Sequence, residues 1–238
     1  MKEMITLLDK CCTITNNFES DYIYDGKIVP RVTKIISSFN IDDGLMKWAN
    51  SLGFKHQSYI KTLAEAAMIG TLCHNNIDEF MEDNKHELPP SINNKAACAY
   101  NSFRIWFDGI SKLADVSVIF HEKQISCKYF GGTLDGFYKI NGKNYLIDYK
   151  TSNHIRYSYF LQIAAYRYML REELGINTDG CIVLQLNKNN ISFNEYALDF
   201  SRPEDLSFIN TCEQAFLSLV YAYYNITNVN NIYKTMRW

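Results

Sequence analysis

Residues 131–150 read GGTLDGFYKINGKNYLIDYK, and this stretch decides the expected fold. On both sides of Asn141 and Gly142, β-branched, apolar and aromatic residues either alternate with polar ones or follow one another. An Asn-Gly pair between two such runs is a strong signal for a two-residue β-hairpin turn. We therefore predict strands over Thr133 to Ile140 and Lys143 to Lys150. A third run, Val116 to Ile125, has the same β-branched and aromatic character, so the three together predict an antiparallel meander.

The predicted turn also determines which side chains face each other. If Asn141 and Gly142 are the central turn residues, counting back along both strands places Asp135 opposite Asp148. Lys150 shares the face of Asp148, because side chains alternate along a strand. Two facing carboxylates repel each other unless a positive group lies between them. A bound cation is the simplest remedy, and an ordinary salt bridge to Lys150 is the alternative.

Helices are predicted elsewhere from apolar residues at three- and four-residue spacing. The predicted helices are Asp42 to Trp48, His56 to Phe80 with a break suggested by Gly70, Asn94 to Leu113, Ile155 to Glu173 and Pro203 to Tyr224. Two short strands are predicted at Gly180 to Asn187 and Ile191 to Leu198, and Met81 to Pro90 reads as a loop. This order predicts an α/β (α+β) fold with a mixed sheet flanked by helices. We expect a single domain, 1–238, with a mostly helical part at 1–113, the sheet core at 114–200 and a closing helix and tail at 201–238.

Composition limits the class of protein. The chain has 238 residues, 47% hydrophobic and 21% charged, which is typical of a globular protein and not of a disordered one. A net charge of -2 excludes nucleic-acid binding through overall positive charge and leaves a local basic groove open. The seven cysteines show no CxxC spacing, which favours reduced, intracellular thiols. Without a membrane-spanning run or an apolar signal segment, we expect a cytoplasmic protein with no membrane partner.

Several motifs occur in order around the predicted hairpin. Gly132-Thr133-Leu134-Asp135 is followed by Ile147-Asp148-Tyr149-Lys150-Thr151 and then by Gln162-Ile163-Ala164-Ala165-Tyr166. Together they resemble the GxxD, (D/E)xK and QxxxY motifs of the PD-(D/E)XK nuclease superfamily, in its RecB-like exonuclease branch. Upstream, Gly70-Thr71-Leu72-Cys73-His74 is similar to the helical G-x-x-x-H segment of that branch. Val29-Pro30-Arg31-Val32-Thr33 resembles the Pro-Ser-Val-Thr entry of phage exonucleases and of the mitochondrial genome-maintenance exonuclease, with Arg31 in place of serine.

The resemblance implies a restriction-endonuclease-like core with a helical N-terminal elaboration. It implies that His74, Asp135, Asp148 and the Tyr149 carbonyl bind Mg²⁺ or Mn²⁺, and that Lys150 handles the attacking water. Gln162 and Tyr166 would complete the catalytic set by holding Lys150 or contacting the DNA backbone. The candidate DNA contacts are Arg31, Thr33, Thr151, Arg156 and Tyr159. The iron–sulfur subgroup of the family has three late cysteines, whereas here only Cys212 lies near the C-terminus, so we expect no iron–sulfur cluster.

Some residues near the motifs have two readings from the sequence. Asp78 lies one helical turn after His74 and would either orient its imidazole or be a plain exposed carboxylate. Glu122 would either reach the metal or be a solvated strand carboxylate, and we expect the second. For Tyr159 we expect packing against the sheet rather than contact with DNA.

The sequence therefore predicts a metal-dependent DNA exonuclease that hydrolyses phosphodiester bonds in recombination, repair or replication, in a phage or other virus. The expected partner is DNA with a free end, with single-stranded DNA among the candidates. One alternative is an RNA or DNA endonuclease of the same fold. The other is a catalytically inactive nucleic-acid-binding protein on a nuclease fold, against which the presence of His74, Asp135, Asp148 and Lys150 argues.

Overall fold

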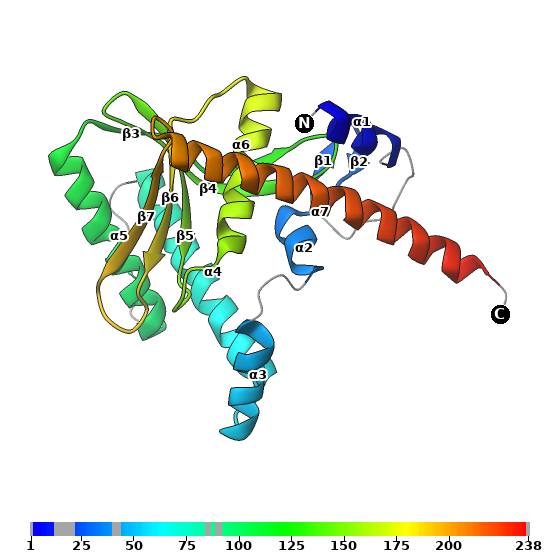
Figure 1. The fold of residues 1–238 in the computed structure, drawn as a ribbon. Helices are drawn as coiled ribbons and strands as arrows, with labels where there is room; N and C mark the ends of the chain where they lie inside the picture. The colour runs from blue at the N-terminus through cyan, green and yellow to red at the C-terminus, as the bar shows by residue number, and fades with distance from the viewer. Residues whose placement is uncertain (1, 12–21, 40–43, 84–86, 89–91, 237–238) are drawn as a thin grey trace.

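The computed structural model describes residues 2–11, 22–39, 44–83, 87–88 and 92–236 (Figure 1). Its helices are α1 (Lys2–Cys11), α2 (Val32–Ser37), α3 (Gly44–Phe54), α4 (Tyr59–Asp83), α5 (Asn94–Leu113), α6 (Tyr157–Leu174) and α7 (Pro203–Thr235). Its strands are β1 (Ile23–Tyr24), β2 (Lys27–Ile28), β3 (Val116–Ser126), β4 (Gly131–Ile140), β5 (Lys143–Lys150), β6 (Gly180–Leu186) and β7 (Phe193–Asp199). The described part of the chain is thus α+β, with one five-stranded sheet, a small two-stranded sheet and flanking helices.

The five-stranded sheet has the order β3-β4-β5-β6-β7, and it is mixed. Only the β5–β6 pair is parallel, because α6 crosses over between these two strands, whereas the other neighbours are antiparallel. Asn141 and Gly142 form the β4–β5 turn, with φ values of 49° and 81°, as the two left-handed positions of this turn type require. The register of the hairpin, with Ile140 opposite Lys143, confirms the predicted pairing.

Helices cover both faces of the sheet. On one face, Leu146 of β5 and Val183 of β6 belong to a core shared with α1, α2, α6 and α7. On the other face, Ile147 and Leu184 of the same strands belong to a core shared with α4 and α5. Neighbouring residues of a strand point to opposite faces, so β5 and β6 need apolar residues on both faces where helices cover them. Residues 181–186 of β6 are all buried and apolar except Gln185, and the buried apolar residues of β5 are Leu146, Ile147 and Tyr149.

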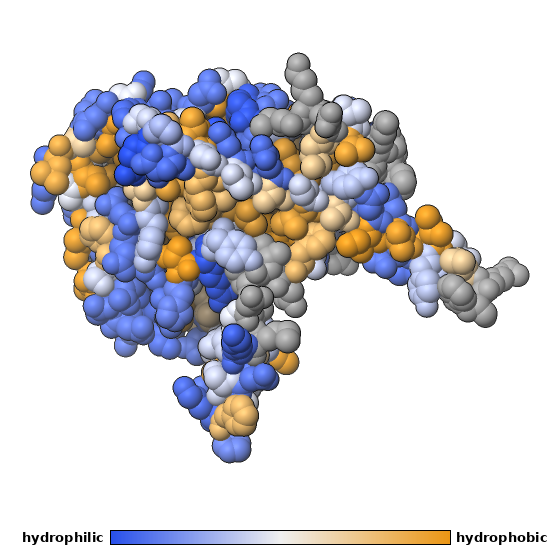
Figure 2. All heavy atoms as spheres, viewed as in Figure 1, coloured by the Kyte–Doolittle hydropathy of each residue, from blue (hydrophilic) through white to orange (hydrophobic). Residues whose placement is uncertain are grey.

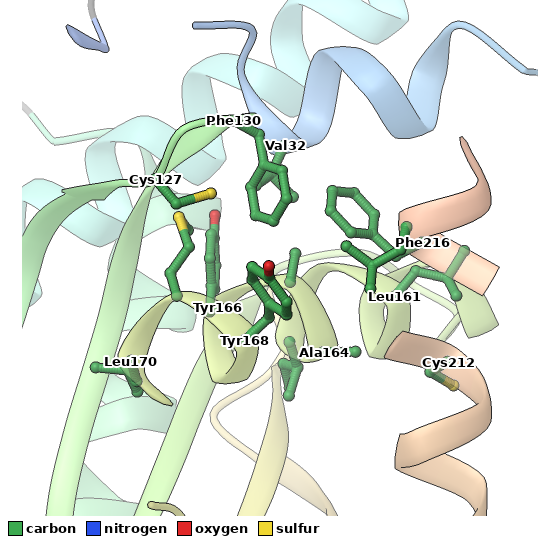
Figure 3. Packing of buried hydrophobic residues seen from close by; sticks show 14 of the residues in the cluster. Val32, Cys127, Phe130, Leu161, Ala164, Tyr166, Tyr168, Leu170, Cys212 and Phe216 are labelled. Atoms are coloured by element: carbon green, nitrogen blue, oxygen red, sulfur yellow. The ribbon is translucent and has the colours of Figure 1, made fainter. Parts of the chain in front are cut away.

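Helix α6 lies at the centre of the first core. Figure 3 shows Leu161, Ala164 and Tyr168 of this helix among side chains from α7 and from the chain that precedes β4. The rings of Phe130 and Phe216 meet edge to face, with their centroids 4.9 Å apart. Because this helix is held on both sides, side chains near its N-terminus have fixed positions relative to the ends of β4 and β5.

Several element boundaries differ from the sequence prediction, and the first predicted helix continues past Trp48 to Phe54. Gly70 does not break α4, which runs unbroken from Tyr59 to Asp83, because a single glycine costs a packed helix only about 1 kcal/mol. The predicted loop at 81–90 therefore begins later, and its residues 84–86 and 89–90 lie outside the described residues, as do residues 42 and 43 of the first predicted helix. Helix α7 continues past the predicted end at Tyr224 to Thr235.

Two segments project from the body. Helix α3 and the first turns of α4 form one, and the C-terminal end of α7 forms the other (Figure 1). The projecting end of α7 exposes apolar side chains, among them Ile226, Val229 and Ile232 (Figure 2). Among the described residues, no helix is long and apolar enough to cross a membrane.

Candidate functional site

The candidate site lies where β4 and β5 separate. Their ladder ends at the pair Gly136 and Ile147, so the next residues, Asp135 and Asp148, face each other without backbone hydrogen bonds between them. The Asp135 carboxylate occupies this gap, and its Oδ2 accepts a hydrogen bond from the backbone N–H of Tyr149 at 2.8 Å. Both aspartates are buried, Asp135 at 7% exposure and Asp148 at 1%. The predicted juxtaposition of the two carboxylates is therefore present at the strand ends.

Helix α4 brings His74 to the same point. Its Nδ1 donates to Glu122 Oε1 at 3.0 Å and lies 3.7 Å from Asp135 Oδ1. Its Nε2 lies 3.3 Å from the carbonyl oxygen of Tyr149, the carbonyl that the resemblance implies as a metal ligand. Burial lowers the pKa of His74, but the Asp135 and Glu122 carboxylates outweigh it and raise the pKa to about 9. In the metal-free protein at neutral pH, His74 is therefore an imidazolium that donates through both nitrogens.

Glu122 belongs to the site, which the sequence analysis did not expect. In the β3–β4 pairing His121 faces Gly136 and Lys123 faces Leu134, so Glu122 is aligned with Asp135 but is skipped by the ladder. Its φ of 40° is left-handed, a conformation that a non-glycine residue rarely adopts within a strand. With the backbone in this conformation, the Glu122 carboxylate hydrogen-bonds to His74. The sequence analysis instead expected a carboxylate exposed to solvent. Nothing in the sequence signals such a backbone turn at a glutamate.

Asp148 and Lys150 form a second, adjoining pair. Lys150 Nζ lies 2.8 Å from Asp148 Oδ1 and 2.7 Å from Oδ2. Burial and the Asp135 charge raise the pKa of Asp148 to about 7, even though Lys150 opposes the shift. Burial lowers the pKa of Lys150, but the Asp148 and Asp135 carboxylates raise it above its usual value overall. Lys150 also lies over the Tyr159 ring, 5.1 Å from its centroid, so Tyr159 both packs near the sheet and faces the site.

Gln162 and Tyr166 lie on one face of α6 and contact each other. Gln162 Nε2 donates to the Tyr166 hydroxyl at 3.0 Å, and both side chains are buried. A Cβ placed on Gly132 would lie 2.5 Å from a ring carbon of Tyr166, so the glycine of the GxxD motif is required by the tyrosine of the QxxxY motif. The hydrogen bond joins Gln162 to Tyr166, whereas the sequence analysis predicted contact with Lys150 or DNA.

The predicted DNA-contact residues differ in their exposure. Arg31 is exposed, lies over the ring of Tyr22 and pairs through its backbone with Gly131, next to the GxxD motif. Thr33 is exposed on α2, and Arg156 is half-buried as the residue before α6. Thr151 Oγ1 lies 3.6 Å from the Cβ position of Gly70, so it packs against α4.

Asp78 has a different partner from the one weighed in the sequence analysis. Its Oδ1 lies 2.5 Å from Nδ1 of His121, and His74 is oriented by Glu122 instead. Helix α4 and strand β3 are thus joined by two polar pairs, His74 with Glu122 and Asp78 with His121. Both pairs fix the helix that carries His74 against the strand that carries Glu122.

The donor set fits a divalent metal ion. One ligand atom from each of His74, Glu122 and Asp135 lies within 4.8 Å of the others. Carboxylate oxygens with one imidazole suit Mg²⁺ or, more readily, Mn²⁺. Asp148 is outside this set of three and forms an ion pair with Lys150. In the metal-free protein the protonated His74 supplies the positive charge that the carboxylates require.

No model of a known protein family matches the chain, and no curated protein matches it. Among solved structures, the chain is similar to SSO0001 at 13% sequence identity and a TM-score of 0.35. The match covers 91% of this chain and 86% of that one. A similarity at this level says nothing about function.

Because the backbone at Glu122 is left-handed, we expect Glu122→Gly to be more stable than Glu122→Ala, the reverse of the usual order in a strand. Glu122→Ala and Glu122→Gly both remove the carboxylate, but only glycine adopts a φ of 40° without strain. We expect the glycine variant to be more stable by about 0.5–1 kcal/mol, whereas in an ordinary strand it would be less stable by a similar amount. Urea unfolding of the metal-free proteins measures the difference. A glycine variant less stable than the alanine variant would show that the residue is unstrained.

The raised pKa of His74 predicts a loss of stability at alkaline pH. Because the folded-state pKa of about 9 lies above the ordinary 6.5, its stabilisation is complete below pH 6.5 and is lost as the pH rises through 9. We expect metal-free wild type to lose about 1–3 kcal/mol across this window, and His74→Gln to lose much less. Unfolding curves at pH 6, 7.5 and 9.5 test this. Parallel losses in the two proteins would refute the ion-pair role.

Proposed function

We propose that this chain is a metal-dependent nuclease of the PD-(D/E)XK type, with a restriction-endonuclease-like core. The observation that carries the proposal is the convergence of His74, Glu122 and Asp135 beside the Asp148–Lys150 pair, where two strands separate. Buried carboxylates that face each other repel, and so much buried charge is rarely retained without a function. The three motifs quoted from the sequence meet at this one point, which further supports the proposal.

The proposed reaction is attack of water on the phosphorus of a phosphodiester. A divalent metal ion held by His74, Glu122 and Asp135 would supply Lewis-acid stabilisation of the charge that develops on the phosphate oxygens. Asp135 is held in place by the N–H of Tyr149, so it presents its remaining lone pairs without having to reorganise. Lys150 carries a positive charge, because its pKa is raised, and therefore acts as a donor that orients water or phosphate rather than as a base. Asp148 fixes the position of Lys150.

Residues outside the charged group would support it. Gln162 and Tyr166 form a buried pair on α6. The Tyr166 ring packs against Gly132 of β4, three residues before Asp135 on the same strand. The ring of Tyr159 lies beside the Lys150 amine, 5.1 Å from ring centroid to Nζ. Arg31, Thr33, Thr151 and Arg156 remain the proposed contacts to the DNA backbone, and among them Arg31 is the exposed cation beside the GxxD strand.

Substitutions at the site should abolish cleavage. Asp135→Asn removes a proposed metal ligand, Lys150→Ala removes the water-orienting group, and Asp148→Asn removes the charge that positions Lys150. For each we expect at least about a 10²-fold loss of rate with Mn²⁺ or Mg²⁺. Chelation by EDTA should abolish the activity of wild type. Glu82→Gln, an exposed carboxylate on the same helix α4, is the matched control and should retain full rate. Full activity of folded Asp148→Asn or Asp135→Asn would remove the basis of the proposal.

The exonuclease assignment rests only on the resemblance to the RecB-like branch. It predicts that linear DNA is shortened from its ends while covalently closed circles of the same sequence persist. Gel analysis of both substrates with Mn²⁺ measures this. If circles are nicked or linearised as fast as linear DNA disappears, the endonuclease alternative replaces the exonuclease.

A different class of function, an inactive nucleic-acid-binding protein, makes the opposite prediction. Such a protein would bind DNA equally well with Asp135→Asn and would show no metal-dependent cleavage of any DNA or RNA. The complete set of charged residues at the site favours the enzyme, because a binding protein gains nothing from the cost of keeping Asp148 buried against the charge of Lys150.

A further inference from the structure

Helix α3 and the first turns of α4 form a projecting arm, defined here as residues 44–68 (Figure 1). The two helices contact each other through Trp48 and Tyr59, whose rings meet edge to face at 5.5 Å. Large apolar side chains of the arm remain uncovered, with Phe54 88% exposed and Ile60 76% exposed. An arm that projects from the body and exposes such residues is poorly explained as packing for the core.

One face of α4 runs from the arm directly into the candidate site. Positions 60, 63, 67, 70 and 74 follow the three- and four-residue spacing of a single helical face. Ile60 and Leu63 are exposed on this face, and His74 lies at its other end among the carboxylates. At about 1.5 Å per residue, the apolar face reaches about 21 Å outward from His74.

The charges on the arm are almost all positive. Lys47, Lys55 and Lys61 are exposed, and none of them forms an ion pair with a described residue. The only acidic residue of the arm, Glu65, is paired with Lys95 at 2.7 Å. Asp42 and Asp43, which precede the arm in the sequence, lie outside the described residues. A chain with a net charge of -2 therefore carries, on the segment that leads to its site, three exposed lysines that form no ion pair with any described residue.

We propose that the arm binds single-stranded nucleic acid and guides it to the site, an inference that rests on the proposed nuclease function. Unpaired bases expose apolar faces that stack on side chains such as Phe54, and the phosphates between them are attracted to lysines. Duplex DNA keeps its bases stacked inside, so exposed phenylalanine and isoleucine would have little to contact. The combination of free lysines with exposed apolar residues on one segment therefore selects the single strand.

The test measures binding of fluorescein-labelled dT20 by anisotropy in EDTA, so that cleavage does not enter the measurement. We expect Lys47→Gln/Lys55→Gln/Lys61→Gln to bind roughly tenfold or more weakly at 0.1 M salt, with the slope of log K against log salt reduced by about 2. Phe54→Ala/Ile60→Ala should also weaken binding while leaving this slope unchanged, because it removes stacking surface and no charge. The matched control, Lys112→Gln/Lys139→Gln/Lys234→Gln, removes the same charge from exposed lysines elsewhere and should bind dT20 as wild type does.

Several results would overturn the inference while leaving the nuclease proposal intact. Wild-type affinity in both arm variants would mean that the exposed apolar residues serve another contact, such as a protein. Failure of wild type to bind dT20, or an equal loss for a 20-bp duplex, would overturn the assignment to single strands. Loss of metal-dependent cleavage is a separate measurement, since a protein that binds dT20 through the arm and cleaves nothing would refute the nuclease proposal alone. Circular dichroism of each variant confirms that α3 and α4 remain folded.

Discussion

The site depends on compensation of closely spaced negative charge, two of whose three carboxylates, Asp135 and Asp148, are buried. Glu122, Asp135 and Asp148 converge where β4 and β5 separate, and each is opposed by a cation in the metal-free protein. Lys150 neutralises Asp148, and the imidazolium of His74 stands between Glu122 and Asp135. A divalent ion bound here would displace the proton of the His74 imidazolium. Metal binding would therefore be linked to the release of a proton. The need to compensate these carboxylates also explains why α4 lies close to the sheet. Of the two compensating cations among the described residues, Lys150 belongs to β5, whereas His74 comes from α4.

Most of the fold could be predicted from the sequence because its signals are local. The Asn141-Gly142 turn set the register of β4 and β5, and that register placed Asp135 against Asp148 before any tertiary contact was considered. The limits of α4 and α7 were missed for a different reason. Gly70 is tolerated inside α4, and α7 continues past Tyr224, because packing and helix continuity outweigh single-residue signals.

The site was predictable only where a motif marks it. His74, Asp135, Asp148 and Lys150 stand at motif positions, and the structure brings all four together. Glu122 was misjudged because its role depends on a left-handed backbone inside a strand, which no residue type at that position encodes. The Asp78–His121 pair was missed because it joins a helix to a strand 43 positions away, and the sequence offers only the nearer histidine, His74, as a partner.

The proposed function depends on a divalent metal ion bound by His74, Glu122 and Asp135. Anomalous difference density from crystals soaked in Mn²⁺, recorded above and below the manganese absorption edge for wild type and for Asp135→Asn, tests this binding directly. Wild type should show a strong peak within bonding distance of the three side chains, and the variant should lose it or show it markedly weakened. Manganese peaks elsewhere but none among these residues, or an equally strong peak in Asp135→Asn, would contradict it.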